Sequence, residues 1–485
     1  MDTAKRKENG KTGALVNISA KTFLRVTALL FALVIVSAIL TYVIPRGEFG
    51  VQEDGETLDY SQYISRDDLG GISPVKAIFA PVLVFFSGDG LSLLMLTLFL
   101  FIISASFQVM NDVGGIHALI GAVSDRFRTR KRTLLILVSF LFYCFGSFLG
   151  LFEEMLTMLP IVTVLCVMLG FDSFTGFLCC IVACGFGFAG AITNPFTVLL
   201  ASQIIGVNPM EKIWYRLVIF AVMFLLYLGY LFYYLHRLSR DPEAGVTAEH
   251  DKRLRAEIAG RAEAGEQDPG TARRARIVYS AFLLSALVLI IVSSTIPAMR
   301  DYTVVVLIAY FLIFGLTAGA IVSGSLSRVF RSFGKGFLGA LPTMVFIAFA
   351  ASVKYIFQEG AILPTVVHQI NTLADGKNPL AIALIIYLIV LALEFFISSS
   401  TAKAVLVMGV LSIVQVGLSK PMMVLLYTFA DGYTNVLFPT SPVLLISLSM
   451  IGVDYLRWVR RSLPLFLVNF LLVLLFISIG VAIRY

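Results

Sequence analysis

Apolar residues are gathered along the chain into blocks of about 20 residues, the length of helix that crosses a hydrocarbon core ~30 Å thick. The blocks are apolar on every face, as in LLFALVIVSAILTYVI at 29–44, whereas the strands of a membrane barrel alternate polar and apolar residues. The pattern therefore predicts an all-α polytopic membrane protein. Spans are predicted at 24–44, 91–111, 174–205, 214–235, 277–297, 302–322, 336–356, 421–451 and 463–484.

Two further apolar segments, 133–169 and 379–418, are too long for one membrane span and barely long enough for two. We expect each to form a re-entrant hairpin, which enters and leaves the membrane on the same side. With the N-terminal tail 1–23 in the cytoplasm, this threading places most basic segments on the cytoplasmic side, as the positive-inside rule requires. If each segment instead crossed the membrane once, RFRTRKR (126–132) and RWVRR (457–461) would still lie on the cytoplasmic side. Charge alone therefore does not decide between re-entrant hairpins and single crossings.

A weak internal repeat supports the hairpin threading. The string IGVN at 205–208 recurs as IGVD at 451–454, and the same offset of 246 residues brings TNPFT at 193–197 onto PTSPV at 439–443. The unpaired span 277–297 lies between the two copies, so an odd number of crossings separates them. The second copy is then predicted to be inverted in the membrane, which is the architecture of many secondary transporters.

The repeat divides the chain into two halves around a charged linker. Residues 236–276 are expected to form a solvated, partly helical cytoplasmic linker, and residues 45–72 an external loop. The predicted units are a first inverted repeat over 24–235, the linker with its connecting span over 236–301, and a second inverted repeat over 302–485.

Proline residues predict that one helix in each half is broken near the middle of the membrane. Pro195 interrupts the span 174–205, and Pro439 and Pro442 interrupt the span 421–451, because proline lacks an amide donor and disfavours helix at the preceding residue. Irregular backbone is viable there only against protein or a watery cavity. The residues expected to bind substrate or ion at the breaks are Thr193, Asn194, Pro195, Thr197, Asp431, Asn435, Pro439, Thr440 and Ser441, with Asn194 or Thr440 as a transient sodium site. The alternative is that these hydroxyls bond back to the preceding turn of an ordinary membrane helix.

The predicted hairpin tips contain the other polar candidates. GLFEEMLTMLP at 150–160 places Glu153 and Glu154 inside an apolar run, where a charge costs at least ~2.5 kcal/mol and should face a cavity or a partner. The matching tip in FFISSSTAKAVLVM offers Ser398, Ser399, Ser400, Thr401 and Lys403. The alternatives are an interfacial Glu pair at a helix start and a lysine that snorkels to the surface.

Composition narrows the function classes. Of the 485 residues, 58% are apolar and 14% charged, against about 25% charged in soluble domains. The net charge of +7 is explained by cytoplasmic basic segments, so nucleic acid is not an expected partner. The five cysteines lack metal-ligand spacing, so neither a metal site nor a cofactor is expected, beyond a coupling sodium ion or proton.

Four strings together resemble the YfcC-type branch of the four-carbon dicarboxylate anaerobic carrier family, within the ion transporter superfamily. They are TYVIPRGEF (41–49), GLFEEM (150–155), GFAGAITNPFTV (187–198) and DGYTNVLFPTSPVL (431–444). The resemblance implies a bacterial inner-membrane protein, commonly a homodimer, whose transport domain moves like an elevator against a scaffold domain. It also implies small organic-ion substrates, which are dicarboxylates in one branch and basic amino acids exchanged by antiport in the YfcC branch.

Charge alone favours neither branch, but an amino acid could use both kinds of group, so we expect a secondary transporter of an amino acid. The glutamates of one tip suit a cationic group, while hydroxyls and helix N-termini of the other half suit a carboxylate. A four-carbon dicarboxylate carrier and an ion channel are the alternatives, because broken helices also line pores. No HExxH motif, and no GxSxG motif with a base, indicates an enzyme.

Overall fold

The computed structural model describes residues 20–51, 58–66, 70–88, 90–116, 118–119, 121, 127, 129–241, 245–263, 269–300, 302–374, 376–397, 400–413 and 417–485. Within these residues, nine helices are long and apolar enough to cross a membrane, as the hydropathy pattern predicts. They include one helix of each predicted hairpin, whereas the predicted spans 174–205 and 421–451 are divided into shorter helices. The long helices outside these regions are α1 (Ala20–Val43), α3 (Gly90–Asp112), α10 (Ile213–Arg240), α12 (Pro269–Thr295), α14 (Thr303–Ser323), α16 (Leu341–Glu359) and α22 (Tyr455–Ala482).

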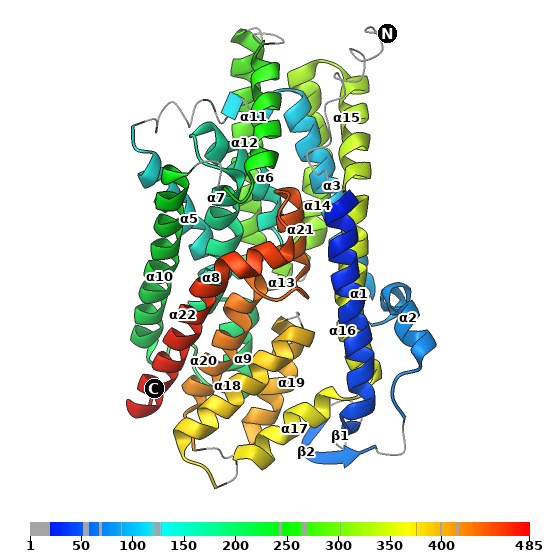
Figure 1. Cartoon of the computed structure of the whole chain (residues 1–485), viewed down its shortest axis with the longest axis vertical. Helices are drawn as coiled ribbons and strands as arrows, with labels where there is room; N and C mark the ends of the chain where they lie inside the picture. The colour runs from blue at the N-terminus through cyan, green and yellow to red at the C-terminus, as the bar shows by residue number, and fades with distance from the viewer. Residues whose placement is uncertain are drawn as a thin grey trace.

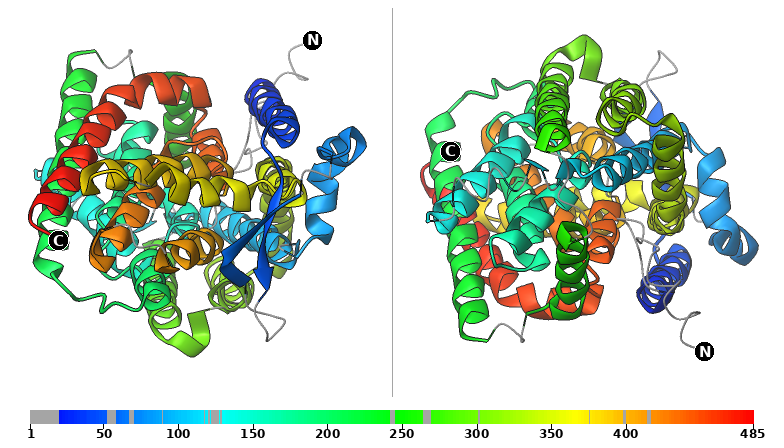
Figure 2. Two further views of the ribbon diagram at one scale, coloured as in Figure 1. Left: turned by 90° about the horizontal axis from the view of Figure 1, so that it is seen from below. Right: turned by 90° about the horizontal axis from the view of Figure 1, so that it is seen from above.

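The helices form two bundles that lie side by side. In the flanking bundle, α3 packs against α14 and α15 (Leu326–Gly339), α12 packs against α14, and α16 packs against α1 and α2 (Pro74–Leu83). The hairpin bundle holds α5 to α10 and α18 to α22. The end views show the blue α1 and α2 on one side and the red α22 with the green α10 on the other (Figure 2). The bundles meet where α16 contacts α21 (Pro442–Met450) and where α3 contacts α6 (Met155–Met168).

Helical hairpins form at both predicted places. In the first, α5 (Lys131–Cys144) continues as the π-helical η2 (Phe145–Leu149), and α6 returns so that Lys131 Nζ lies 2.5 Å from the carbonyl oxygen of Leu169. The second joins α18 (Pro379–Phe396) to α19 (Ser400–Ile413). The 14-residue helices α6 and α19 are about 21 Å long, too short to cross the hydrocarbon core. The hairpins occupy opposite ends of the molecule (Figure 1), but their re-entrant path through a bilayer stays a prediction.

Both predicted helix breaks are confirmed. The first interrupted helix runs through α7 (Ser173–Phe177), η3 (Leu178–Val182) and α8 (Ala183–Ala189), and restarts after 190–194 as η4 (Pro195–Leu199) and α9 (Leu200–Ile205). The second runs through α20 (Lys420–Gly432) and η6 (Tyr433–Val436), and restarts as α21 after 437–441. Each restart has proline at its first position and a capping side chain before it, from Asn194 and Ser441, because this pair satisfies the exposed amides of a new helix.

The order of these elements recurs at the predicted offset. Shifted by 246 residues, the starts of α6, η4 and α10 fall within four residues of the starts of α19, α21 and α22. Each half therefore contains a hairpin, an interrupted helix and a long final helix in the same order. That the second copy is inverted stays a prediction.

The segment 45–72, predicted as an external loop, includes secondary structure, and its location outside the cell stays a prediction. It contains an antiparallel hairpin of β1 (Gly47–Val51) and β2 (Leu58–Ser65), which lies against α17 (Leu363–Ala374). The Tyr63 ring stacks on His368 with centroids 4.1 Å apart, and its hydroxyl is 2.8 Å from that of Thr365. The sequence did not predict this strand pairing, because the residues between the strands are mostly acidic or glycine. The short helices not yet named are η1 (Val84–Phe86), α11 (Ala248–Glu263) in the charged linker, and α13 (Pro297–Arg300).

Gly150 at the tip of the first hairpin provides a test of this packing. Its φ of 68° is left-handed, and an added Cβ would lie 2.7 Å from both Asn194 Oδ1 and a carbon of the Phe196 ring. Gly150→Ala should lower the thermal unfolding midpoint of the detergent-solubilised protein, because left-handed strain alone costs about 1–2 kcal/mol. Gly229→Ala in α10 meets open space and should be neutral or stabilising. Equal midpoints for the two variants would contradict this account of the tip.

Candidate functional site

A cavity of about 380 Å³ lies where both hairpin tips, both helix breaks and the flanking bundle meet. Its polar or charged lining comes from five parts of the chain, and its walls are otherwise apolar. The lining residues with polar side chains are Ser92, Glu153, Lys354, Ser400, Asn435 and Ser441. The structure thus brings the two predicted tips and the two predicted breaks to one place.

The two predicted glutamates of the first tip have different surroundings. Glu153 is exposed and lines the cavity, so its carboxylate faces the space a substrate would occupy. Glu154 is only 8% exposed and is not among the described lining residues. One oxygen of its carboxylate has no hydrogen-bond partner. The pair therefore separates into a cavity residue and a buried residue.

The polar residues of the first break hold the backbone together. Asn194 Oδ1 accepts from the amides of Phe196 at 2.9 Å and Thr197 at 3.3 Å, while Asn194 Nδ2 donates to the carbonyl of Gly146 at 3.0 Å. Thr193 Oγ1 donates to the carbonyl of Phe148 at 3.2 Å. Pro195 and Thr197 are buried, and of this segment only Phe196 lines the cavity. The predicted sodium site at Asn194 thus falls on a side chain already engaged with three backbone groups.

The second break contributes directly to the cavity wall. Ser441, Pro442 and Val443 bring the start of α21 to the cavity, and a helix N-terminus favours a negatively charged group. Asn435 lines the cavity and donates to the carbonyl of Asp431 at 2.7 Å. Two predicted residues, Pro439 and Thr440, are buried and lie outside the lining.

The second tip is built around a buried lysine. Lys403 is 0% exposed, forms an ion pair with Glu394, and places its Nζ 2.6 Å from Asp431 Oδ1. The snorkelling alternative is therefore wrong, and neither Lys403 nor Asp431 is among the described lining residues. Ser400 lines the cavity and donates to Asp431 Oδ2 at 2.9 Å, so the ion pairs fix the position of this hydroxyl. Ser398, Ser399 and the side chain of Thr401 lie outside the described residues.

Lys354 is a cavity residue that the sequence reasoning missed. It belongs to α16 in the flanking bundle and lines the cavity together with the hairpin tips. The available signal was a single lysine in the apolar run FIAFAASVKYIF (346–357). With Lys354 and Glu153 on its wall, the cavity presents one group of each charge. It is therefore suited to a small molecule with both an ammonium and a carboxylate group.

The buried ion pairs predict a large effect of removing Lys403. Lys403→Met leaves Glu394 and Asp431 as uncompensated buried charges, and breaking such a pair costs about 3–5 kcal/mol. The variant should show a markedly lower unfolding midpoint in detergent, whereas Lys377→Met at an exposed position should match the parent protein. Replacing Glu394 and Asp431 by leucine as well should recover most of the loss. A stable single variant would show that Lys403 is not needed to neutralise the acids.

Comparison with known proteins places the chain among transporters. The family model described as C4-dicarboxylate anaerobic carrier matches residues 24–482. The "Putative basic amino acid antiporter YfcC" of Escherichia coli (strain K12) is 24% identical over 474 residues, covering 89% of this chain and 91% of that protein. An uncharacterized protein of Haemophilus influenzae is 23% identical over 373 residues, covering 76% of this chain and 71% of that protein.

Two solved structures are similar at low identity. The YdaH transporter of Alcanivorax borkumensis has a TM-score of 0.41 at 15% identity, with 95% of this chain and 99% of that chain covered. MtrF of Neisseria gonorrhoeae has a TM-score of 0.39 at 14% identity, with 94% of each chain covered. Because the family model spans nearly the whole sequence, this chain belongs to the C4-dicarboxylate anaerobic carrier family and is a multi-pass membrane transporter.

Proposed function

We propose that the chain exchanges amino acids, basic ones in particular, across the membrane. The observation that supports this most is the cavity with Glu153 on the hairpin side and Lys354 on the flanking side. An amino acid offers a carboxylate to Lys354 and the start of α21, and an ammonium or guanidinium to Glu153. The name of the Escherichia coli relative, a basic amino acid antiporter, points to the same substrate class.

A four-carbon dicarboxylate is the second candidate, and the family description favours it. Lys354, Ser441 and the start of α21 would suit one carboxylate. The second carboxylate would face Glu153, and like charges in a cavity repel unless one is protonated. We therefore place the dicarboxylate second.

The interface between the bundles supports an elevator-like mechanism. A small cavity of about 30 Å³ between the bundles has a largely apolar lining, which includes Leu100 and Phe107 of α3, Leu156 of α6 and Ile446 of α21. An apolar interface resists sliding little, but the ion pair between Arg25 of α1 and Asp454 before α22 joins the two bundles and would have to break. Movement of the hairpin bundle would expose the cavity to each side of the membrane in turn. A homodimer in the bacterial inner membrane, with a cytoplasmic N-terminus, completes the proposal.

Counterflow in proteoliposomes tests the substrate class. Vesicles containing the purified full-length protein and loaded with arginine should accumulate external labelled arginine or ornithine, because both substrates supply a cation and a carboxylate. Succinate and fumarate should not exchange. Saturation with rising external substrate separates a carrier from a channel. Exchange of succinate without exchange of arginine would overturn the amino acid assignment in favour of the dicarboxylate.

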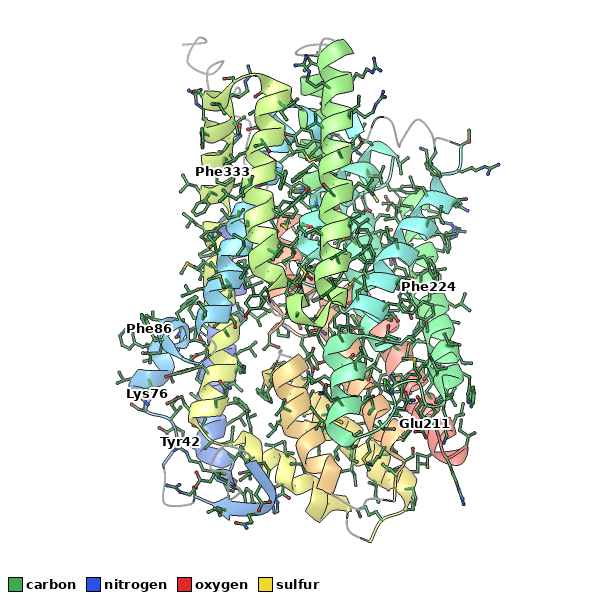
Figure 3. All side chains as sticks on the ribbon, turned by 180° about the vertical axis from the view of Figure 1, so that it is seen from behind. Tyr42, Lys76, Phe86, Glu211, Phe224 and Phe333 are labelled. Carbon is green, nitrogen blue, oxygen red and sulfur yellow. The ribbon has the colours of Figure 1, made fainter. Side chains whose placement is uncertain are left out.

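Two cavity variants test the charge assignment within the same assay. Glu153→Gln should raise the KM for arginine about 10- to 100-fold, because it removes a charge-assisted contact worth about 1.5–3 kcal/mol. Lys354→Met should raise the KM by a similar factor. Glu211→Gln at the outer edge of the molecule (Figure 3) should leave the KM unchanged. Glu153→Gln protein with an unchanged KM for arginine would contradict the placement of the cationic group.

A further inference from the structure

Glu154 is a buried carboxylate whose neutralising charge is not provided by the described residues. It is 8% exposed, its Oε2 has no hydrogen-bond partner, and no basic side chain in the described part of the chain forms an ion pair with it. Its neighbour Glu153 faces the cavity, where the proposed substrate would neutralise it. An ionised carboxylate in apolar surroundings is strongly unfavourable without a positive partner. The start of α6 offers only a partial positive charge, so a further positive charge would stabilise the ionised form of Glu154.

A second orphaned oxygen lies one turn further along α6. Thr157 is 0% exposed and its hydroxyl has no hydrogen-bond partner. By comparison, Thr163 of the same helix donates back to the carbonyl of Leu159, and Thr434 donates to that of Ala430, whereas Thr197 shares the orphaned state of Thr157. Residues three apart share one face of a helix, so the oxygens of Glu154 and Thr157 are on the same side of α6.

In the second half of the chain, the position that corresponds to Thr157 is occupied by a positively charged residue. The offset of 246 residues pairs Thr157 with Lys403, which occupies the same place on the returning helix of its hairpin. The Lys403 ammonium lies between Glu394 and Asp431, so this half contains its own cation. In the first half the same position offers a hydroxyl beside a carboxylate. The second half therefore has a fixed positive charge with two buried acids, whereas the first half has a hydroxyl and a carboxylate without a lysine.

The donor atoms define the kind of cation. A carboxylate and a hydroxyl are hard oxygen donors. A tightly bound divalent ion would require a group of at least three His, Cys, Asp or Glu residues, and the described structure contains no such group. The nearby thiols of Cys180 and Cys184 already donate to the carbonyls of Met155 and Leu151. We propose that Glu154 and Thr157 contribute to a Na⁺ site beside the substrate cavity, at the start of α6.

Thermal unfolding of the purified full-length protein in detergent tests this site without any substrate. NaCl should raise the unfolding midpoint relative to choline chloride at equal ionic strength, and the shift should grow with Na⁺ concentration, because a ligand that binds the folded state stabilises it. Glu154→Gln should abolish the Na⁺-dependent shift. Its own midpoint without Na⁺ should equal or exceed that of the parent protein, because the substitution removes an uncompensated charge.

Matched variants separate the site from its neighbours. Glu153→Gln should keep the Na⁺-dependent shift, although it impairs substrate exchange, so failure of the substrate assignment and failure of the Na⁺ site are distinguishable. Thr157→Val should require higher Na⁺ for the same shift and Thr157→Ser should restore it, while Thr163→Val on the same helix should behave as the parent.

Three results would overturn the proposal. The first is an equal Na⁺-dependent shift in Glu154→Gln and the parent protein. The second is no shift in the parent protein at any Na⁺ concentration. The third is a parent protein stabilised by acidification but not by Na⁺, which would assign a proton rather than Na⁺ to Glu154.

Discussion

The demand that every buried backbone group find a hydrogen-bond partner governs the centre of this molecule. Breaking a membrane helix frees amides and carbonyls that hydrocarbon cannot satisfy. Asn194 meets this demand at the first break by bonding two amides of the new helix and the Gly146 carbonyl of the hairpin. Ser147 adds a bond to the carbonyl of Gly190 at 2.8 Å. The break and the hairpin tip are thus held by one hydrogen-bond network, which brings tips and breaks to a common cavity.

Charge is distributed around that cavity under a second constraint. Buried carboxylates near the cavity need compensating partners, and these partners differ between the two halves of the chain. In the second half, Lys403 lies between Glu394 and Asp431, and Asp431 in turn accepts from Ser400 on the cavity wall. In the first half, Glu153 faces the cavity and Glu154 is buried behind it. The same architecture therefore contains a fixed cation in the second half, whereas no described side chain forms an ion pair with the two glutamates of the first half.

Local signals predicted the framework of the site, but not its ion pairs. Proline at the restart of each interrupted helix and charge inside an apolar run are readable from single segments, so the breaks and the first tip were located correctly. The partners of Lys403 lie nine and 28 residues away in sequence, on different helices, and only tertiary packing brings them together. Lys354 was missed for a similar reason, because its apolar helix gives no indication of the bundle it faces. The strands β1 and β2 were missed because their short, polar segments show little alternation.

The location of these contacts bears on how the site could move. The hydrogen bonds that shape both breaks are made within the hairpin bundle, including the bond from Trp458 Nε1 to the carbonyl of Val436 at 2.8 Å. Movement of this bundle would therefore leave the tips and breaks intact. Lys354 belongs to the flanking bundle and would change its position relative to Glu153. A substrate held between the two charges would lose its contact to Lys354 as the bundle moves, so on this proposal binding would be strongest in the conformation that brings the bundles together at the cavity.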